Sequence, residues 1–290
     1  MENNKFGKQL DLNNIMVNSF LGYKYRKEHD ALYSKDANVP SELIKLYYSG
    51  YVDKSDFNEV KRSFINKYIK NESESEGVHE KEEIKGLQVM YEDMVAMDSN
   101  DFEMFSIMTL HRDLYSKCPY PEAGGVLRSG AVFLPGTGTD LEDYTNIFDS
   151  LLSLEDVVND LKKLAIYMRE TNNYSEIFKF VENCVKLKCR LIKIHPFEDG
   201  NGRTVRCFIN KLFEIAGIPP VYIKPNEKLE YNDAVDLANN KDDYNDITGF
   251  YLYKICDSII ELDVNEQFKK QKKKIKEENN QKIYKMRRKK

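Results

Sequence analysis

Residues 195–206 bring together the side-chain types of a phosphate-binding and phosphate-transfer site. The stretch contains a histidine, an acid four residues later, two glycines around an asparagine, and two arginines, namely His195, Asp199, Gly200, Asn201, Gly202, Arg203 and Arg206. Glycine lets the backbone turn tightly and approach a ligand closely. A histidine is the type of group that acts as a general base near neutral pH. The acid could hold Mg²⁺ against phosphate oxygens, because Mg²⁺ takes few protein oxygens and completes its shell with phosphates.

Two helices are expected to position this stretch. Apolar residues repeat at helical spacing from Val205 to Ala216, and Gly217 with two prolines beyond it ends the pattern. The glycine turn therefore lies at a helix N-terminus, where free N–H groups and the helix dipole favour an anion. Arginines in that first turn oppose the dipole, and a bound polyphosphate would reverse the penalty. A second helical pattern, Tyr174 to Ile194, delivers His195.

These residues match the motif HPFx(D/E)GNGRxxR at every specified position, so the chain resembles the Fic family. The resemblance implies an all-α Fic fold and transfer of a nucleotide monophosphate, usually AMP from ATP, to a protein hydroxyl. It implies that His195 deprotonates the target hydroxyl, that Asp199 binds Mg²⁺ and that Phe197 packs the loop into the core. The phosphates would be held by Gly200, Asn201 and Gly202 at the α-phosphate, Arg203 at the β-phosphate and Arg206 at the γ-phosphate.

Gly202 separates subclasses of the superfamily. Doc-type kinases have lysine at this position and bind ATP turned round, so that the γ-phosphate is transferred, and Gly202 therefore favours nucleotidyl transfer. Three alternatives stay open. The enzyme could transfer UMP, GMP or phosphocholine, it could remove AMP with Glu76 aligning the attacking water, or the chain could be a non-catalytic module that binds a partner.

Glu76 is the predicted inhibitory residue. From the residues alone, 71–78 is an acidic, serine-rich break between two helices, which favours a solvated linker. Many Fic enzymes, however, carry an inhibitory motif (S/T)xxxE(G/N) upstream of the core. Glu76 and Gly77 match its end, whereas Glu72 and Ser75 depart from it. Pairing of Glu76 with Arg206 would remove a partner that the γ-phosphate needs, so we expect weak activity with self-modification as its readout.

Two further segments are assigned through the resemblance. Residues 125–135 combine β-favouring residues with flanking glycine and proline, which predicts a short β-hairpin. In the family this flap adds a strand to the target's extended segment, and the target-positioning residues would be Arg128, Ser129, Val132 and Phe133. Residues 231–239 resemble the nucleoside-contacting segment, with Asn232 in place of its second tyrosine. Tyr231 and Asn239 would contact the adenine or ribose, and a plain amphipathic helix is the alternative.

The expected organisation is a helical N-terminal extension (1–70), a Fic core with its upstream inhibitory segment (71–262) and a basic tail (263–290). The net charge of the chain is −4, but residues 269–290 carry +10, which leaves about −14 on the rest. A basic run of this kind is usually a solvated or frayed helix. Electrostatic binding of an acidic partner or nucleic acid is the lesser alternative, and nucleic acid is not an expected partner.

The expected location of the protein is inferred from the absence of a membrane-spanning run and of a signal-peptide core in the sequence. No apolar run approaches the roughly 18 residues of a membrane span, and the first ten residues lack a signal-peptide core. We expect a cytoplasmic protein that has no membrane partner and binds ATP, with a target protein docked on the flap; a homodimer stays open. Five cysteines without CxxC spacing are expected to be buried thiols.

Overall fold

The structure is a computed structural model of the 290-residue chain, and it describes residues 54–133, 139–255, 257–258 and 277, with side chains from residue 62 onward. The helices are α3 (Lys54–Glu76), α4 (Lys81–Ala96), α5 (Ser106–Tyr115), α6 (Ile147–Leu152), α7 (Glu155–Thr171), α8 (Ile177–Ile194), α9 (Asn201–Ala216) and α10 (Lys228–Lys241). Residues 245–255 form a further helix, and three short 3-10 turns span Pro121–Ala123, Tyr144–Asn146 and Pro225–Glu227. The described residues contain no strand. The all-α prediction is therefore confirmed, while most of the expected N-terminal extension lies outside the described residues.

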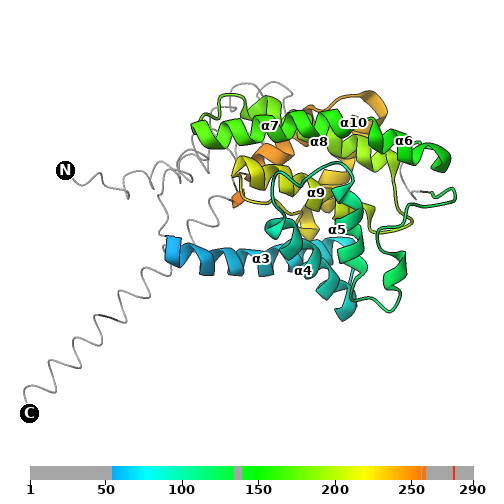
Figure 1. Ribbon diagram of the computed structural model, residues 1–290, viewed down its shortest axis with the longest axis horizontal. Coiled ribbons are helices and arrows are strands. Elements are labelled where there is room, and N and C mark those ends of the chain that lie inside the picture. The colour runs from blue at the N-terminus through cyan, green and yellow to red at the C-terminus, as the bar shows by residue number, and fades with distance from the viewer. Residues whose placement is uncertain (1–53, 134–138, 256, 259–276, 278–290) are drawn as a thin grey trace, which may run out of the picture.

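Helix α9 is the centre of the fold. It lies in the middle of the molecule with α7 on one side and α3 and α4 on the other (Figure 1), and it contacts α4, α5, α7 and α8. Fourteen of its sixteen residues are buried, as expected for a helix that is covered on all sides. Gly217 ends it in the left-handed conformation (φ 73°), where Ile218 N–H donates to Phe213 O at 2.8 Å. The helix that begins at the glycine turn is thus held rigidly by the core.

Helix α8 delivers His195 as predicted. Its apolar face buries side chains at helical spacing, including Phe180, Cys184, Leu187 and Leu191. The helix closes where His195 N–H donates to Leu191 O at 3.0 Å, and His195 itself takes a left-handed φ of 48°. That conformation is uncommon for a residue other than glycine. It turns the chain sharply out of the helix and into the loop that leads to α9.

The predicted break at residues 71–78 is wrong, because α3 continues to Glu76 and ends at Gly77 (φ 68°). Serines can be accommodated in a helix when their hydroxyls bond the preceding turn. Ser73 Oγ donates to Ile69 O at 2.7 Å, and Ser75 Oγ donates to Glu72 O at 3.1 Å. The break between helices follows Gly77 instead, and the predicted domain boundary after residue 70 falls inside one continuous helix.

The predicted β-hairpin flap is not confirmed. Residues 124–133 are irregular, and residues 134–138 lie outside the described residues. The segment pairs with the active loop, since Arg128 N–H donates to Pro196 O at 2.9 Å. On its far side, Glu142 N–H donates to Lys193 O at 2.9 Å. The flap residues are therefore tied to the end of α8 at both sides.

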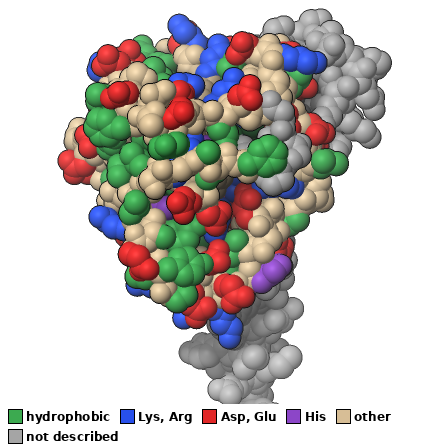
Figure 2. All heavy atoms as spheres, turned by 90° about the vertical axis from the view of Figure 1, so that its right-hand side faces the viewer, with side chains coloured by type: hydrophobic (Ala, Val, Ile, Leu, Met, Phe, Trp, Pro, Cys, Tyr) green, Lys and Arg blue, Asp and Glu red, His purple; other side chains and the backbone are tan. Residues whose placement is uncertain are grey.

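The remaining expectations concern the surface and the thiols. Acidic side chains are spread among basic and hydrophobic ones on the face drawn in Figure 2. Four cysteines are buried and free, as predicted, namely Cys118, Cys184, Cys189 and Cys207, while Cys256 lies outside the described residues. The basic tail also lies outside them, apart from Glu277. In the part of the chain that the structure describes, no helix has the length and apolar character to cross a membrane.

Candidate active site

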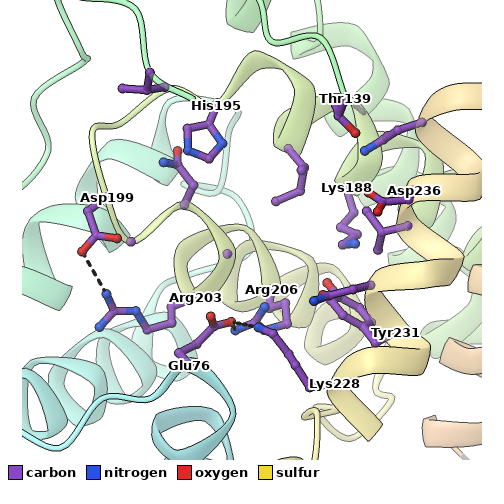
Figure 3. A pocket seen from close by; sticks show the side chains of 18 of the residues that line it. Glu76, Thr139, Lys188, His195, Asp199, Arg203, Arg206, Lys228, Tyr231 and Asp236 are labelled. Carbon is purple, nitrogen blue, oxygen red and sulfur yellow. Dashed lines mark hydrogen bonds and ion pairs between the residues drawn. The ribbon is translucent and has the colours of Figure 1, made fainter. Parts of the chain in front are cut away.

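One cavity of about 490 Å³ gathers most of the predicted site residues. Its volume lies in the range of small-molecule sites. Its lining includes Glu76, Val132, Phe133, His195, Asp199, Gly200, Asn201, Gly202, Arg203, Arg206, Tyr231 and Asn239. Figure 3 shows His195 at one edge, Asp199 and Arg203 on one side, and Lys188, Tyr231 and Asp236 on the opposite side. Arg128 and Ser129 are not among the lining residues.

His195 has the properties of a general base. Its side chain is buried with 9% exposure, and burial lowers its pKa, so the imidazole is neutral near pH 7. The ring lines the cavity. A neutral imidazole at this place can accept a proton from a hydroxyl that enters the cavity.

Arg128 holds the loop of His195 in position. Its guanidinium donates to the carbonyl oxygens of His195 (2.7 Å), Gly130 (2.8 Å) and Glu142 (2.6 Å). The side chain is buried, so it contacts the backbone of the active loop and of both sides of the flap. Its predicted role as a contact for the target does not fit this burial, whereas Ser129 and Phe133 are exposed.

The side chain of Asn201 is used within the loop. Its Oδ1 accepts from Phe197 N–H at 3.0 Å, and its Nδ2 donates to Phe197 O at 2.7 Å. The turn can therefore offer a phosphate its backbone N–H groups at the start of α9, as helix N-termini do. Phe197 is fully buried, which confirms its predicted packing role.

His111 has a structural role, and its hydrogen bonds identify its tautomer. Gly125 N–H donates to His111 Nδ1 at 2.8 Å, so Nε2 carries the proton and donates to Asp199 O at 3.0 Å. The ring stacks on Phe197 with centroids 3.7 Å apart. Burial lowers the pKa of His111 to about 4. A neutral histidine thus joins the start of the flap to the active loop.

Asp199 presents a carboxylate to the cavity. Its side chain is 80% exposed, and its Oδ2 accepts from Tyr115 OH at 2.9 Å and lies 3.5 Å from Arg203 Nη2. Among the described residues, no three His, Cys, Asp or Glu side chains cluster as a metal site. A cation here would have one protein carboxylate and would take its other ligands from phosphates and water. That donor set fits Mg²⁺.

Arg206 is held between two carboxylates of α3. Its Nε donates to Glu72 Oε2 at 2.7 Å, and its Nη2 makes a short contact with Glu76 Oε1, which also accepts from Lys228 Nζ at 2.7 Å. Burial opposes the charge of Arg206, yet the two carboxylates raise its pKa well above the ordinary value. Burial likewise opposes ionisation of Glu76, but Arg206 and Lys228 lower its pKa to about 2. Glu76 is therefore an anion that occupies the cavity side of Arg206 (Figure 3).

Gly202 allows this close approach. A Cβ at this position would lie 3.2 Å from Arg206 Nη1 and 3.3 Å from Glu76 Oε1. Any side chain would crowd the contact between the arginine and the glutamate. The backbone of the turn can approach both groups because residue 202 is glycine.

Comparison with known proteins agrees with this geometry. A model of the Fic/DOC family matches residues 102–213, which contain α5 to α8, the whole active loop and most of α9. This part of the chain is a Fic domain. Protein adenylyltransferase Fic of Aedes aegypti is 30% identical over 177 residues, a match that covers 58% of this chain and 32% of that protein. The protein of the same name from Nematostella vectensis is 30% identical over 148 residues, covering 50% and 30%. The match thus spans about a third of these curated relatives.

Solved structures share the fold of this Fic domain. A Fic domain containing signaling protein from Bacteroides thetaiotaomicron superposes with a TM-score of 0.58 at 19% identity, covering 77% of this chain and 97% of that one. A fragment of Fic-1 from C. elegans gives a TM-score of 0.63 at 18% identity, covering 84% and 77%. At such identities the likeness concerns the fold.

The cavity and its surroundings also contain residues that the sequence did not reveal as site residues. Arg203 Nη1 donates to Glu83 Oε2 at 3.1 Å, and Glu83 lies in the first turn of α4. Glu72 precedes Glu76 by one helical turn. This spacing would have placed both carboxylates on the same face if α3 had been predicted to continue through residues 71–76. Lys228 and Lys188 line the same cavity, and no motif marks them. Both motif arginines are thus paired with acids from helices upstream of the loop.

Proposed function

We propose that the chain is a protein adenylyltransferase, which transfers AMP from ATP to a hydroxyl side chain of a target protein. The observation that carries the proposal is the shared cavity of a neutral, buried His195 and two buried arginines, Arg203 and Arg206. The base suits a hydroxyl nucleophile, and the arginines suit a polyphosphate. The relatives named protein adenylyltransferase support the same activity, although the match covers only part of each.

In the proposed reaction the target's hydroxyl oxygen attacks the α-phosphorus of ATP. The hydroxyl proton moves to His195, the bond between the α-phosphorus and its bridging oxygen breaks, and pyrophosphate leaves. Arg203, Arg206 and the N-terminus of α9 neutralise the phosphates. Mg²⁺ bound at Asp199 would add positive charge between phosphate oxygens. Catalysis then comes from positioning and charge neutralisation.

Autoinhibition by Glu76 is part of the proposal. The γ-phosphate needs the guanidinium nitrogens of Arg206 that face the cavity. One of them, Nη2, donates to Glu76 Oε1, and the same oxygen also accepts from Lys228 Nζ. While the glutamate is in place, the triphosphate cannot be seated fully. The wild-type chain should therefore transfer AMP slowly, and self-modification is the simplest readout.

The target is proposed to dock on the flap. Phe133 is 81% exposed at the rim of the cavity, and Val132 lines it beside His195. An extended segment of the target, running along these residues, would bring its hydroxyl to the histidine. A cytoplasmic location stays a prediction.

The test is transfer of label from ATP carrying ³²P at the α-phosphate, in the presence of Mg²⁺. We expect Glu76→Gly to raise protein-bound label about 10- to 100-fold, since it removes one charged hydrogen bond to Arg206. His195→Ala in the same background should lower label by at least about 100-fold. Glu74→Gly is the matched control, because Glu74 lies in the same last turn of α3 but is exposed and pairs only with Lys70 among the described residues.

Each variant can contradict a separate part of the proposal. Equal label in wild type and Glu76→Gly would rule out the inhibitory role. Label that persists in His195→Ala would rule out the proposed base. Label from α-labelled UTP or GTP, or from labelled CDP-choline, with none from ATP would identify a different donor. No label from any of them would leave a binding module.

A further inference from the structure

Lys188 is a buried cation without a polar partner. The side chain is fully buried in α8, and its Nζ has no hydrogen-bond partner in the structure. Nζ lies 4.3 Å from the centroid of the Tyr231 ring. Lysines are almost never fully buried unless paired, since an unpaired charge is costly to desolvate. We therefore expect a ligand to offset the desolvation cost of the Lys188 charge.

Lys188 points into the cavity described above. It lies two helical turns before the end of α8, and both Lys188 and His195 line this cavity. Asn239 on α10 lines the same cavity, and its buried Nδ2 also lacks a partner, as does Thr139 Oγ1. Figure 3 shows Lys188, Thr139, Tyr231 and Asp236 together at the end away from Asp199. Donors without acceptors therefore accumulate at this end.

The cations that would bind the phosphates of a nucleotide lie in another part of the cavity, away from Lys188. Arg203 and Arg206 come from the first turns of α9, where the helix N-terminus adds its own positive end. With the triphosphate seated there, the end of the cavity lined by Lys188 and Asp236 (Figure 3) is left for another part of the nucleotide. Both of these line the cavity, and the described residues show no ion pair between them. A donor and an acceptor that do not contact each other are free to bind a third group.

We propose that Lys188 and Asp236 recognise the base of the donor nucleotide, with Lys188 as a specificity-determining residue. The inference rests on the proposed function. Adenine carries a ring-nitrogen acceptor beside its amino donor, whereas the matching edge of guanine carries two acceptors. Lys188 donates to the ring nitrogen, and Asp236 accepts from the amino group. Guanine would set its O6 against the carboxylate, so the pair favours ATP over GTP.

The proposal separates binding from folding. Lys188→Met keeps the length of the side chain and removes a charge that has no hydrogen-bond partner and lies over the Tyr231 ring. The free energy of unfolding of the nucleotide-free protein should therefore stay unchanged or rise, because a buried cation is replaced by an apolar group. A lysine with a structural role would give the opposite result. Lys188→Gln, which keeps donors without the charge, serves as the second variant should the first not fold.

The decisive measurement is calorimetric binding in the Glu76→Gly background with ATP, GTP and inorganic tripolyphosphate. We expect Lys188→Met to weaken ATP binding about 10- to 100-fold, the range of one charged hydrogen bond, and to leave tripolyphosphate binding unchanged. Asp236→Asn should reduce the preference for ATP over GTP. Lys186→Met is the matched control, because Lys186 lies on the same helix but is 45% exposed and paired with Glu182.

Two results would overturn the inference. Equal weakening for ATP and tripolyphosphate would make Lys188 another phosphate cation, and unchanged ATP affinity would leave it without a ligand role. The labelling assay distinguishes this failure from failure of the proposed function. If Glu76→Gly transfers AMP while Lys188→Met binds ATP normally, only the inference is lost. If no label is transferred while Lys188→Met weakens ATP binding selectively, only the activity is lost.

Discussion

Glu72 and Glu76 lie one turn apart on the same face of α3 and hold the same arginine, but their surroundings differ. Glu72 is fully buried, and its second oxygen accepts from the backbone N–H of Ile223 at 3.1 Å. Glu76 is 23% exposed at the cavity, and its other partner is the side chain of Lys228. One carboxylate is fixed by the backbone, and the other is held by side chains at a ligand site.

Under the proposed function, the difference means that Glu76 could leave Arg206 without damaging the fold. Removing the sole partner of a buried charge is strongly destabilising. Because Glu72 stays on Nε of Arg206, departure of Glu76 does not leave the guanidinium uncompensated. Glu72 also fixes the orientation of the guanidinium, so that its terminal nitrogens remain directed at the cavity. The same arginine can then alternate between Glu76 and a phosphate.

The largest expected effect is the loss of Glu72. Glu72→Ala leaves Arg206 with a single, partly exposed partner and the N–H of Ile223 without its acceptor. We expect the free energy of unfolding to fall by about 3–5 kcal/mol, the range for breaking a buried ion pair. Urea denaturation measures it, with Glu74→Ala as the exposed control from the same helix. A loss below about 1 kcal/mol, within the range of a surface pair, would contradict the structural role of Glu72.

The sequence predicted the parts of the site that a short motif carries. The residues from His195 to Arg206 are contiguous and lie between two periodic helices, so their types and spacing were enough to predict a phosphate site at a helix N-terminus. The structure brings them together in one cavity. Local periodicity also predicted α8 and α9 to within a few residues.

Residues that depend on tertiary contacts were missed or misinterpreted. Glu72 looked like a departure from the inhibitory motif, and its burial against Arg206 and Ile223 depends on how α3 packs across the fold. Arg128 looked like a surface residue of a hairpin because one of the carbonyls that it contacts, that of His195, lies 67 residues away in sequence. Lys188 lies in an apolar helical pattern, where nothing in the sequence separates a cavity residue from a solvent-facing one.

The next effect is the pH dependence of the stability that ionised Glu76 contributes. Its pKa is about 2 in the fold and 4.5 as the ordinary value. The ion pair therefore contributes its full stability above pH 4.5, and the contribution is lost as pH falls toward 2. Its size is at most about 3 kcal/mol from the pKa difference. We expect the stability difference between wild type and Glu76→Gln, measured in urea from pH 6 to pH 3, to shrink in this window. A pH-independent difference would mean that Glu76 is not held as an anion.

The smallest effect concerns Lys228, and it distinguishes support of Glu76 in its proposed inhibitory role from direct binding of phosphate by Lys228. Lys228 is 26% exposed and contacts Glu76 Oε1 at 2.7 Å, a pair worth about 1 kcal/mol. Lys228→Met should loosen Glu76 while Arg206 still holds it, and so raise AMP transfer about fivefold, less than Glu76→Gly does. If Lys228 acts only through Glu76, adding Lys228→Met to Glu76→Gly will change nothing further, because the contact it removes is already absent. A fall in transfer in both backgrounds would instead mean that Lys228 binds the phosphates directly. Lys228 would then be a cation that pairs with Glu76 in one state and with the nucleotide in the other, as proposed for Arg206.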